Sequence, residues 1–197
     1  MTRFTIAAAL AALAVWGATS VGAAPFEHKG HKSTSKVDRQ LTRQLAQMRV
    51  ATAPYATDLE KAKADGYRII TPNMKDMGVH YLNPAITDFD HKRPHILVYA
   101  PHEGKHQLVA LEWVFPKKPK KPPLKGARYG SFPAACHYDD GTFTPASSED
   151  DCAPTSNGSP FVFWHPKLVT LHVWVWYPNP DGLYNPTNPL VRPFNDE

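Results

Sequence analysis

The sequence has little cysteine, no long apolar run beyond its N-terminus, and no large excess of charge of either sign. Only two of its 197 residues are cysteine, and 22 basic side chains are nearly balanced by 18 acidic ones. A chain without a long apolar run has no stable membrane span, so a polytopic membrane protein is excluded. The nearly even charge argues against nucleic acid as a partner.

The sequence also lacks the short motifs that identify common enzyme classes. It has no G-x-S-x-G nucleophile elbow, no Walker phosphate loop and no G-x-G-x-x-G dinucleotide fingerprint. It has no closely spaced C-x-x-C pair, which argues against a cysteine metal site. Any chemistry must therefore come from residues that the fold brings together.

The composition is that of a globular protein with many loops. Apolar residues make up 42% and aromatic residues 11%, which excludes a disordered or fibrous chain. Twenty prolines are about twice the usual share, so we expect few long helices. A length near 200 residues is typical of one domain with a proper core.

The N-terminal segment has the pattern of a secretory signal. Residues 1–23 combine the basic Arg3, an apolar run and small residues before a cleavage point after Ala23. Residues 24–35 follow as a polar tether, in which His28 and His31 can capture copper or nickel weakly. We therefore expect a secreted or periplasmic protein whose single globular domain covers residues 36–197.

Cys136 and Cys152 are the only cysteines, and they are 16 positions apart. In an exported protein such a pair is expected to form a disulfide. The bond would close a polar, turn-rich segment and stabilise the fold by roughly 3 kcal/mol.

Residue patterns predict an α+β fold in which one or two N-terminal helices pack on a curled, mainly antiparallel sheet that can approach a barrel. Apolar residues at helical spacing predict a helix over 36–50, ended by Pro54, and a capping box predicts a second over 58–65. Branched and aromatic residues predict six strands, of which the third and fourth form a hairpin. These strands are 67–71, 78–82, 96–100, 107–115, 161–164 and 169–176.

The ten histidines are candidate metal ligands. His91 and His95 have the spacing of a helical zinc pair, but the proline between them forbids that helix. His102 and His106 flank a predicted hairpin turn. Two more histidines are expected to be hydrogen-bonded surface residues at loop edges: His137 and His165.

Alternation along three predicted strands directs His80, Glu112 and His172 to faces that can meet inside the curled sheet. In the strand over 107–115, it places Glu112 on one face with Leu108, Ala110 and Val114. Two histidines and one carboxylate bind zinc in some hydrolases and iron in some oxygenases, and copper also favours imidazole. The alternative is a buried polar network that fixes the register of the sheet. The predicted aromatic walls of the pocket are Tyr99, Trp174 and Trp176.

Several segments resemble a family of exported microbial proteins of unassigned function. The resemblance covers roughly residues 50–190 and is carried mainly by MGVHY, which contains His80, and LHVWVW, which contains His172. Glu112 lies in the apolar strand between these two segments. The resemblance implies one exported domain and adds no activity.

Three functions remain open from the sequence. The first is a module that binds a divalent metal or a small ligand in the aromatic-lined pocket. The second is a metal-dependent hydrolase or oxygenase, in which Glu112 is a ligand or a general base. The third is a structural or interaction protein without a bound metal.

Overall fold

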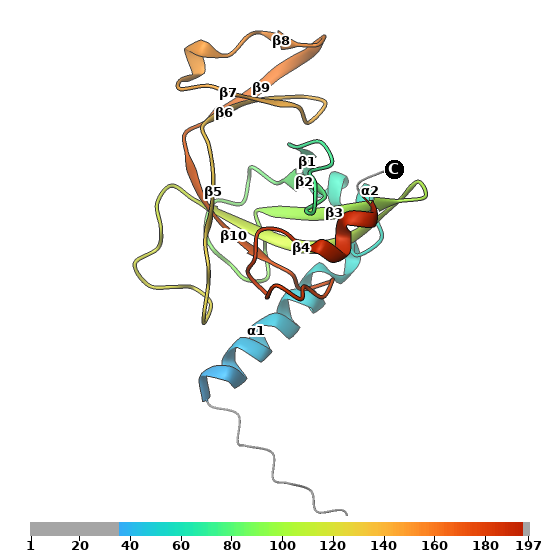
Figure 1. Cartoon of the computed structure of the whole chain (residues 1–197), viewed down its shortest axis with the longest axis vertical. Coiled ribbons are helices and arrows are strands. Elements are labelled where there is room, and N and C mark those ends of the chain that lie inside the picture. Colours follow the sequence, from blue (N-terminus) through green and yellow to red (C-terminus); the bar gives the residue numbers. More distant parts are fainter. Residues whose placement is uncertain (1–35, 195–197) are drawn as a thin grey trace, which may run out of the picture. The chain divides into compact units, whose positions relative to one another are not determined.

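The N-terminal part of the described chain is a long amphipathic helix. The computed structural model describes residues 36–194 (Figure 1), so the predicted signal and tether lie outside the described residues. Helix α1 is Lys36–Thr52, which confirms the predicted helix, and Met48 on it is fully buried. Leu41 and Leu45 pack beside Met48, so one stripe of the helix faces the core.

A turn and a short helix connect α1 to the first strand. The 3-10 turn η1 is Ala53–Tyr55, and α2 is Leu59–Ala64, close to the predicted second helix. Asp58 caps α2 by accepting a hydrogen bond from the backbone N–H of Lys61 at 2.8 Å. The capping box in the sequence starts at Thr57, one residue before the N-cap that the structure shows.

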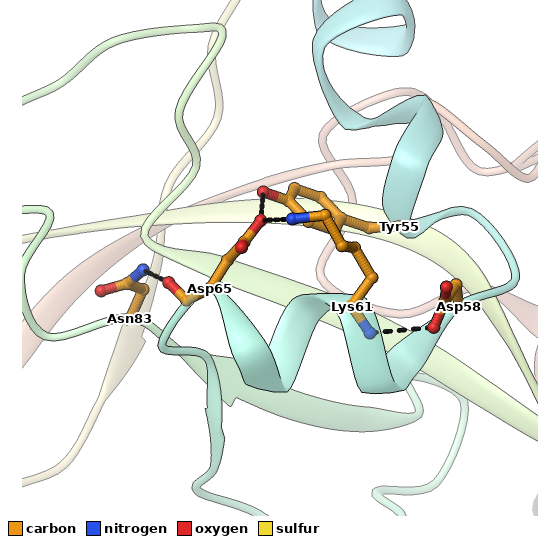
Figure 2. A network of polar contacts seen from close by, with 5 residues as sticks. All are labelled: Tyr55, Asp58, Lys61, Asp65 and Asn83. Carbon is orange, nitrogen blue, oxygen red and sulfur yellow. Dashed lines mark hydrogen bonds and ion pairs between the residues drawn. The ribbon is translucent and has the colours of Figure 1, made fainter.

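A polar network holds this connection together (Figure 2). The hydroxyl of Tyr55 donates to the Asp65 carboxylate at 2.7 Å, and Lys61 forms an ion pair with the same carboxylate. The side chain of Asn83 donates to the Asp65 carbonyl at 2.9 Å. The network therefore links η1 and α2 to the residue that follows strand β2.

Ten strands in the described part of the chain form two antiparallel sheets. The larger sheet has the order β1-β2-β3-β4-β10-β5, and the smaller has the order β7-β6-β9-β8. The larger one consists of β1 Arg68–Ile69, β2 Val79–Leu82, β3 Ile96–His102, β4 Lys105–Phe115, β10 Leu168–Val173 and β5 Gly130–Phe132. The smaller one consists of β6 Ala135–Tyr138, β7 Phe143–Pro145, β8 Thr155–Ser156 and β9 Ser159–His165. The α+β prediction is confirmed, but β1 and β5 end the larger sheet unpaired with each other, so it is not a closed barrel.

The two sheets are connected by two short crossovers (Figure 1). The chain runs from β5 into β6 through Pro133, and from β9 into β10 through Pro166. The disulfide between Cys136 and Cys152 is present, as predicted, and ties β6 to the segment after the 3-10 turn η2, Glu149–Asp151. A third 3-10 turn, η3, is Pro189–Phe194. Within residues 36–194, no helix combines the length and the apolar character needed to cross a membrane.

The two faces of the larger sheet have different environments. One face packs Leu97, Leu111 and Leu171 against α1 and α2 in the main core cluster. The other face presents Ile96 and Val98 to a second, smaller cluster. A register shift between β3 and β4 places Leu108 in the main cluster, which corrects the expectation that Leu108 shares the face of Glu112.

Gly78, directly before β2, is expected to be essential for the position of His80. Its φ is +111°, and a Cβ there would overlap the carbonyl oxygen of Tyr99. Gly78→Ala should therefore lower the free energy of unfolding by about 3 kcal/mol in urea titrations, because β2 must move away from β3.

Gly182→Ala is the matched control, since Gly182 has the same φ of +111° but open space around its Cβ position. It should cost only about 1 kcal/mol from backbone strain. Equal losses in the two variants would contradict the role of the close β2–β3 contact.

Candidate functional site

A cavity of about 300 Å³ lies on the second face of the larger sheet, between that sheet and residues of the smaller one. Its walls are mainly apolar, with a few polar and ionisable groups. The lining residues are Ile70, Thr71, Met74, Met77, His80, Leu82, Ile96, Glu112, Val114, Gly130, Ser131, Phe132, His137, Phe163, His165, Leu168, Thr170 and Pro186.

The sheet places His80 and Glu112 together on one wall. His80 on β2 and Glu112 on β4 are separated by β3, and their side chains meet above it with Nε2 and Oε2 3.7 Å apart. The Nδ1 of His80 lies 3.0 Å from the Thr71 hydroxyl, and the Thr170 hydroxyl hydrogen-bonds to Glu112. Both predicted residues therefore line the cavity, each supported by a threonine.

His172 lies beside this pair but does not line the cavity. It is directly opposite Glu112 in the β4–β10 register, and its ring centroid is 6.1 Å from that of His80. Only 3% of His172 is exposed, and neither ring nitrogen has a hydrogen-bond partner among the described residues. The three predicted residues thus gather on one face, as the alternation of the strands indicates.

Burial shifts all three groups toward their neutral forms. Desolvation raises the pKa of Glu112 to about 7, and the hydrogen bond from Thr170 partly offsets this rise. Desolvation lowers the pKa of His80 to about 4, and it lowers that of His172 to about 3 with a contribution from His80. Near neutral pH the two imidazoles are therefore uncharged, while Glu112 is present in both its protonated and its ionised form.

The predicted aromatic walls lie elsewhere in the fold. Tyr99 is on the opposite, helix-facing side of the sheet, where its hydroxyl donates to the Tyr55 carbonyl at 2.8 Å. Trp176 also packs on the main cluster, because β10 ends at Val173 and the tryptophan follows the end of the strand. Its indole N–H donates to the Thr52 hydroxyl at 2.9 Å. Neither side chain lines the cavity, which corrects these two assignments.

Trp174 lies on the same face as His172, and the two rings are tilted relative to each other with centroids 4.7 Å apart. Its indole N–H donates to the Asn185 carbonyl at 2.7 Å. Trp174 thus buries His172 without reaching the cavity, whose aromatic lining is instead Phe132 and Phe163.

His137 and His165 are buried and line the cavity, so the expectation that they are surface residues is wrong. They are 1% and 9% exposed, on β6 and β9, and their Nε2 atoms are 3.0 Å apart. Desolvation lowers the pKa of His137 to about 4 and lowers that of His165 as well. The apolar run that precedes His165 could have indicated its burial, since this run extends strand β9 to that histidine.

The chemistry of the site is that of an apolar cavity with ionisable groups on two walls. Imidazole and carboxylate groups are the side chains that could hold a metal here. Over residues 36–194, no three His, Cys, Asp or Glu side chains stand in a ready-made metal-binding arrangement.

Comparisons with known proteins do not assign this chain to a family or a function. No protein-family model, curated protein or solved structure matches this chain. The resemblance of the MGVHY and LHVWVW segments to exported proteins stays a prediction from the sequence.

Glu112→Gln is expected to change how stability depends on pH between about 4.5 and 7. Because the pKa of Glu112 is raised from 4.5 to about 7 on folding, the folded chain binds this proton more tightly and loses stability as the pH rises. Glutamine has no such proton. The free energy of unfolding of the variant relative to the wild type should therefore rise across this window, by about 3 kcal/mol at most.

Urea unfolding at several pH values measures this difference. The buried histidines contribute equally to the pH dependence of both proteins, so their contribution cancels in the comparison. Glu103→Gln, at an exposed position, controls for the loss of one carboxyl group. A difference between Glu112→Gln and the wild type that stays constant with pH would contradict the assignment.

Proposed function

We propose that this protein is an exported binding module that holds a small, mainly apolar molecule in the cavity beside His80 and Glu112. The observation that carries the proposal is a buried carboxyl group, 6% exposed, opening into a cavity with otherwise mostly apolar walls. An ionised carboxyl group in such surroundings is costly, and a ligand that bonds to it would offset that cost. The disulfide is typical of an exported protein and supports that part of the proposal.

The cavity indicates the class of ligand. A volume of about 300 Å³ accommodates a compact molecule, and Ile96, Leu168 and Phe163 offer it apolar contacts. Glu112 accepts a hydrogen bond when ionised and donates one when protonated. The ligand that fits is therefore an apolar ring or branched chain carrying one hydrogen-bonding group, with an amine as the best partner for the ionised carboxylate.

A second candidate function is the binding of zinc, copper or iron by His80, Glu112 and His172. The observation that favours it is the pair of unpartnered ring nitrogens on His172, since buried polar atoms normally have partners. The 3.7 Å gap between His80 and Glu112 is longer than a hydrogen bond, so these groups also have capacity left for a ligand. A metal-dependent hydrolase or oxygenase would use the same residues and admit its substrate to the cavity.

Benzylamine and toluene are matched probes for the ligand proposal, because they share a ring and differ in the amine. The wild type should bind benzylamine at least tenfold more tightly in NMR titrations, since a hydrogen bond to a charged group contributes about 1.5 kcal/mol or more. Glu112→Gln should reduce this preference, whereas Glu103→Gln should retain it. Val114→Phe should weaken both probes by filling the cavity. Equal binding of both probes to the wild type would contradict the role of Glu112.

His172→Gln and His172→Leu test the metal candidate. The mature protein, purified without a chelator or a histidine tag, should contain one equivalent of zinc, copper or iron by elemental analysis, and both variants should lose it. If His172 binds no metal, its unpartnered nitrogens only destabilise the fold. In that case His172→Leu should be as stable as the wild type or more stable, and both variants should bind as much of each ion as the wild type does.

A further inference from the structure

His137 and His165 meet across the smaller sheet in an arrangement that ordinary hydrogen bonding does not satisfy. The Nδ1 atom of His137 lies 2.8 Å from the Ile70 carbonyl oxygen, and that of His165 lies 2.7 Å from the Pro166 carbonyl oxygen. Their Nε2 atoms lie 3.0 Å from each other. Every ring nitrogen of the pair therefore has a close polar neighbour.

The carbonyl oxygens determine which nitrogens carry hydrogen. A carbonyl oxygen only accepts, so both Nδ1 atoms must be the N–H donors. A neutral imidazole has one N–H, which leaves a lone pair on each Nε2. Two lone pairs at 3.0 Å repel each other, so the contact requires a positive centre between the nitrogens, either a metal ion or an additional proton.

The separation of the two Nε2 atoms can accommodate a metal ion. Two imidazole nitrogens on one tetrahedral metal, each at roughly 2.0–2.1 Å from it, lie about 3.3 Å apart, within a few tenths of an ångström of the separation here. Histidines that bind metals usually donate their other ring N–H to a carbonyl or carboxylate, as both of these do.

The surroundings offer little to stabilise an extra proton. Neither imidazole forms an ion pair with a carboxylate among the described residues. Phe163 lies parallel to the His137 ring at 4.6 Å, and Phe132 stacks on His165 at 5.3 Å. An imidazolium buried between phenyl rings would lack the carboxylate that usually accompanies a buried charge.

We propose that the Nε2 atoms of His137 and His165 hold a transition-metal ion, copper in preference to zinc, with its remaining positions open to the cavity. Copper forms stronger complexes with imidazole ligands than zinc does. This site does not require the proposed ligand at Glu112 and shares no residue with the set around His172.

The test uses the mature chain carrying His28→Gln and His31→Gln, because these tether histidines can capture copper by themselves. After removal of metal, the protein is titrated with Cu²⁺ and, separately, with Zn²⁺, and bound metal is counted by elemental analysis after dialysis. We expect one tightly bound copper, displaced by excess zinc only slowly. His165→Gln should weaken copper binding at least a hundredfold.

His102→Gln, at an exposed position, is the matched control and should retain the copper. Equal copper uptake by His165→Gln and the wild type would overturn the proposal. Loss of copper in His172→Gln with retention in His165→Gln would overturn it in favour of the His172 site. Benzylamine binding is measured without metal. A failure of the ligand proposal at Glu112 can therefore be distinguished from a failure of the copper proposal at His137 and His165.

A second measurement does not depend on how the variants fold. In long-range ¹H–¹⁵N NMR spectra of the metal-free wild type at neutral pH, both Nε2 signals should be those of unprotonated nitrogens. Zn²⁺, which is diamagnetic, should shift both signals together. A metal-free spectrum in which one ring has both nitrogens protonated would show that a shared proton occupies the position, and would overturn the proposal.

Discussion

Strand β4 lies between β3 and β10, and its antiparallel pairing with β10 sets the position of nearly every group at the site. The register places His172 directly opposite Glu112, and Thr170 opposite Val114. Because β9 leads directly into β10, the same pairing also brings His165 to the edge of the cavity. A slip of one residue would turn these side chains to the helix-facing side of the sheet, where Leu171 and Val173 now pack.

The two faces of this sheet have different roles in the molecule. The helix-facing side is apolar and closely packed, and it includes the fully buried Trp113 and Leu111. The stability from that side offsets the cost of placing imidazole and carboxyl groups in a dry environment on the other. Because desolvation keeps the histidines neutral, Glu112 is the group whose charge state sets the electrostatic character of the cavity near neutral pH.

The sequence pattern predicted every strand of the larger sheet except β5, but only β9 of the smaller sheet. Alternation in MGVHYL and LHV correctly assigned His80 and His172 to the face of Glu112, because strands that pack on a core have a strict two-residue period. The same argument failed for Leu108, because the extra residue in β4 reverses the alternation there.

The strands of the smaller sheet have a weaker residue pattern in the sequence than those of the larger sheet. β7 and β8 have two or three residues each and lie among glycines, prolines and charged residues, so their local sequence resembles loops. His137 was consequently placed on the surface, although tertiary pairing buries it. The opposed Nε2 atoms depend on contacts between β6, β9 and Ile70, which no local pattern encodes.

The docking of α1 has a consequence for biosynthesis. Arg49 donates to the carbonyl of Val175, and Trp176 donates to Thr52, over sequence separations of 126 and 124 residues. The surface that receives the helix therefore exists only after most of the polypeptide has been made, and such distant contacts form slowly. During translation the apolar stripe of α1 stays uncovered for this interval, which gives molecular chaperones time to bind the nascent chain.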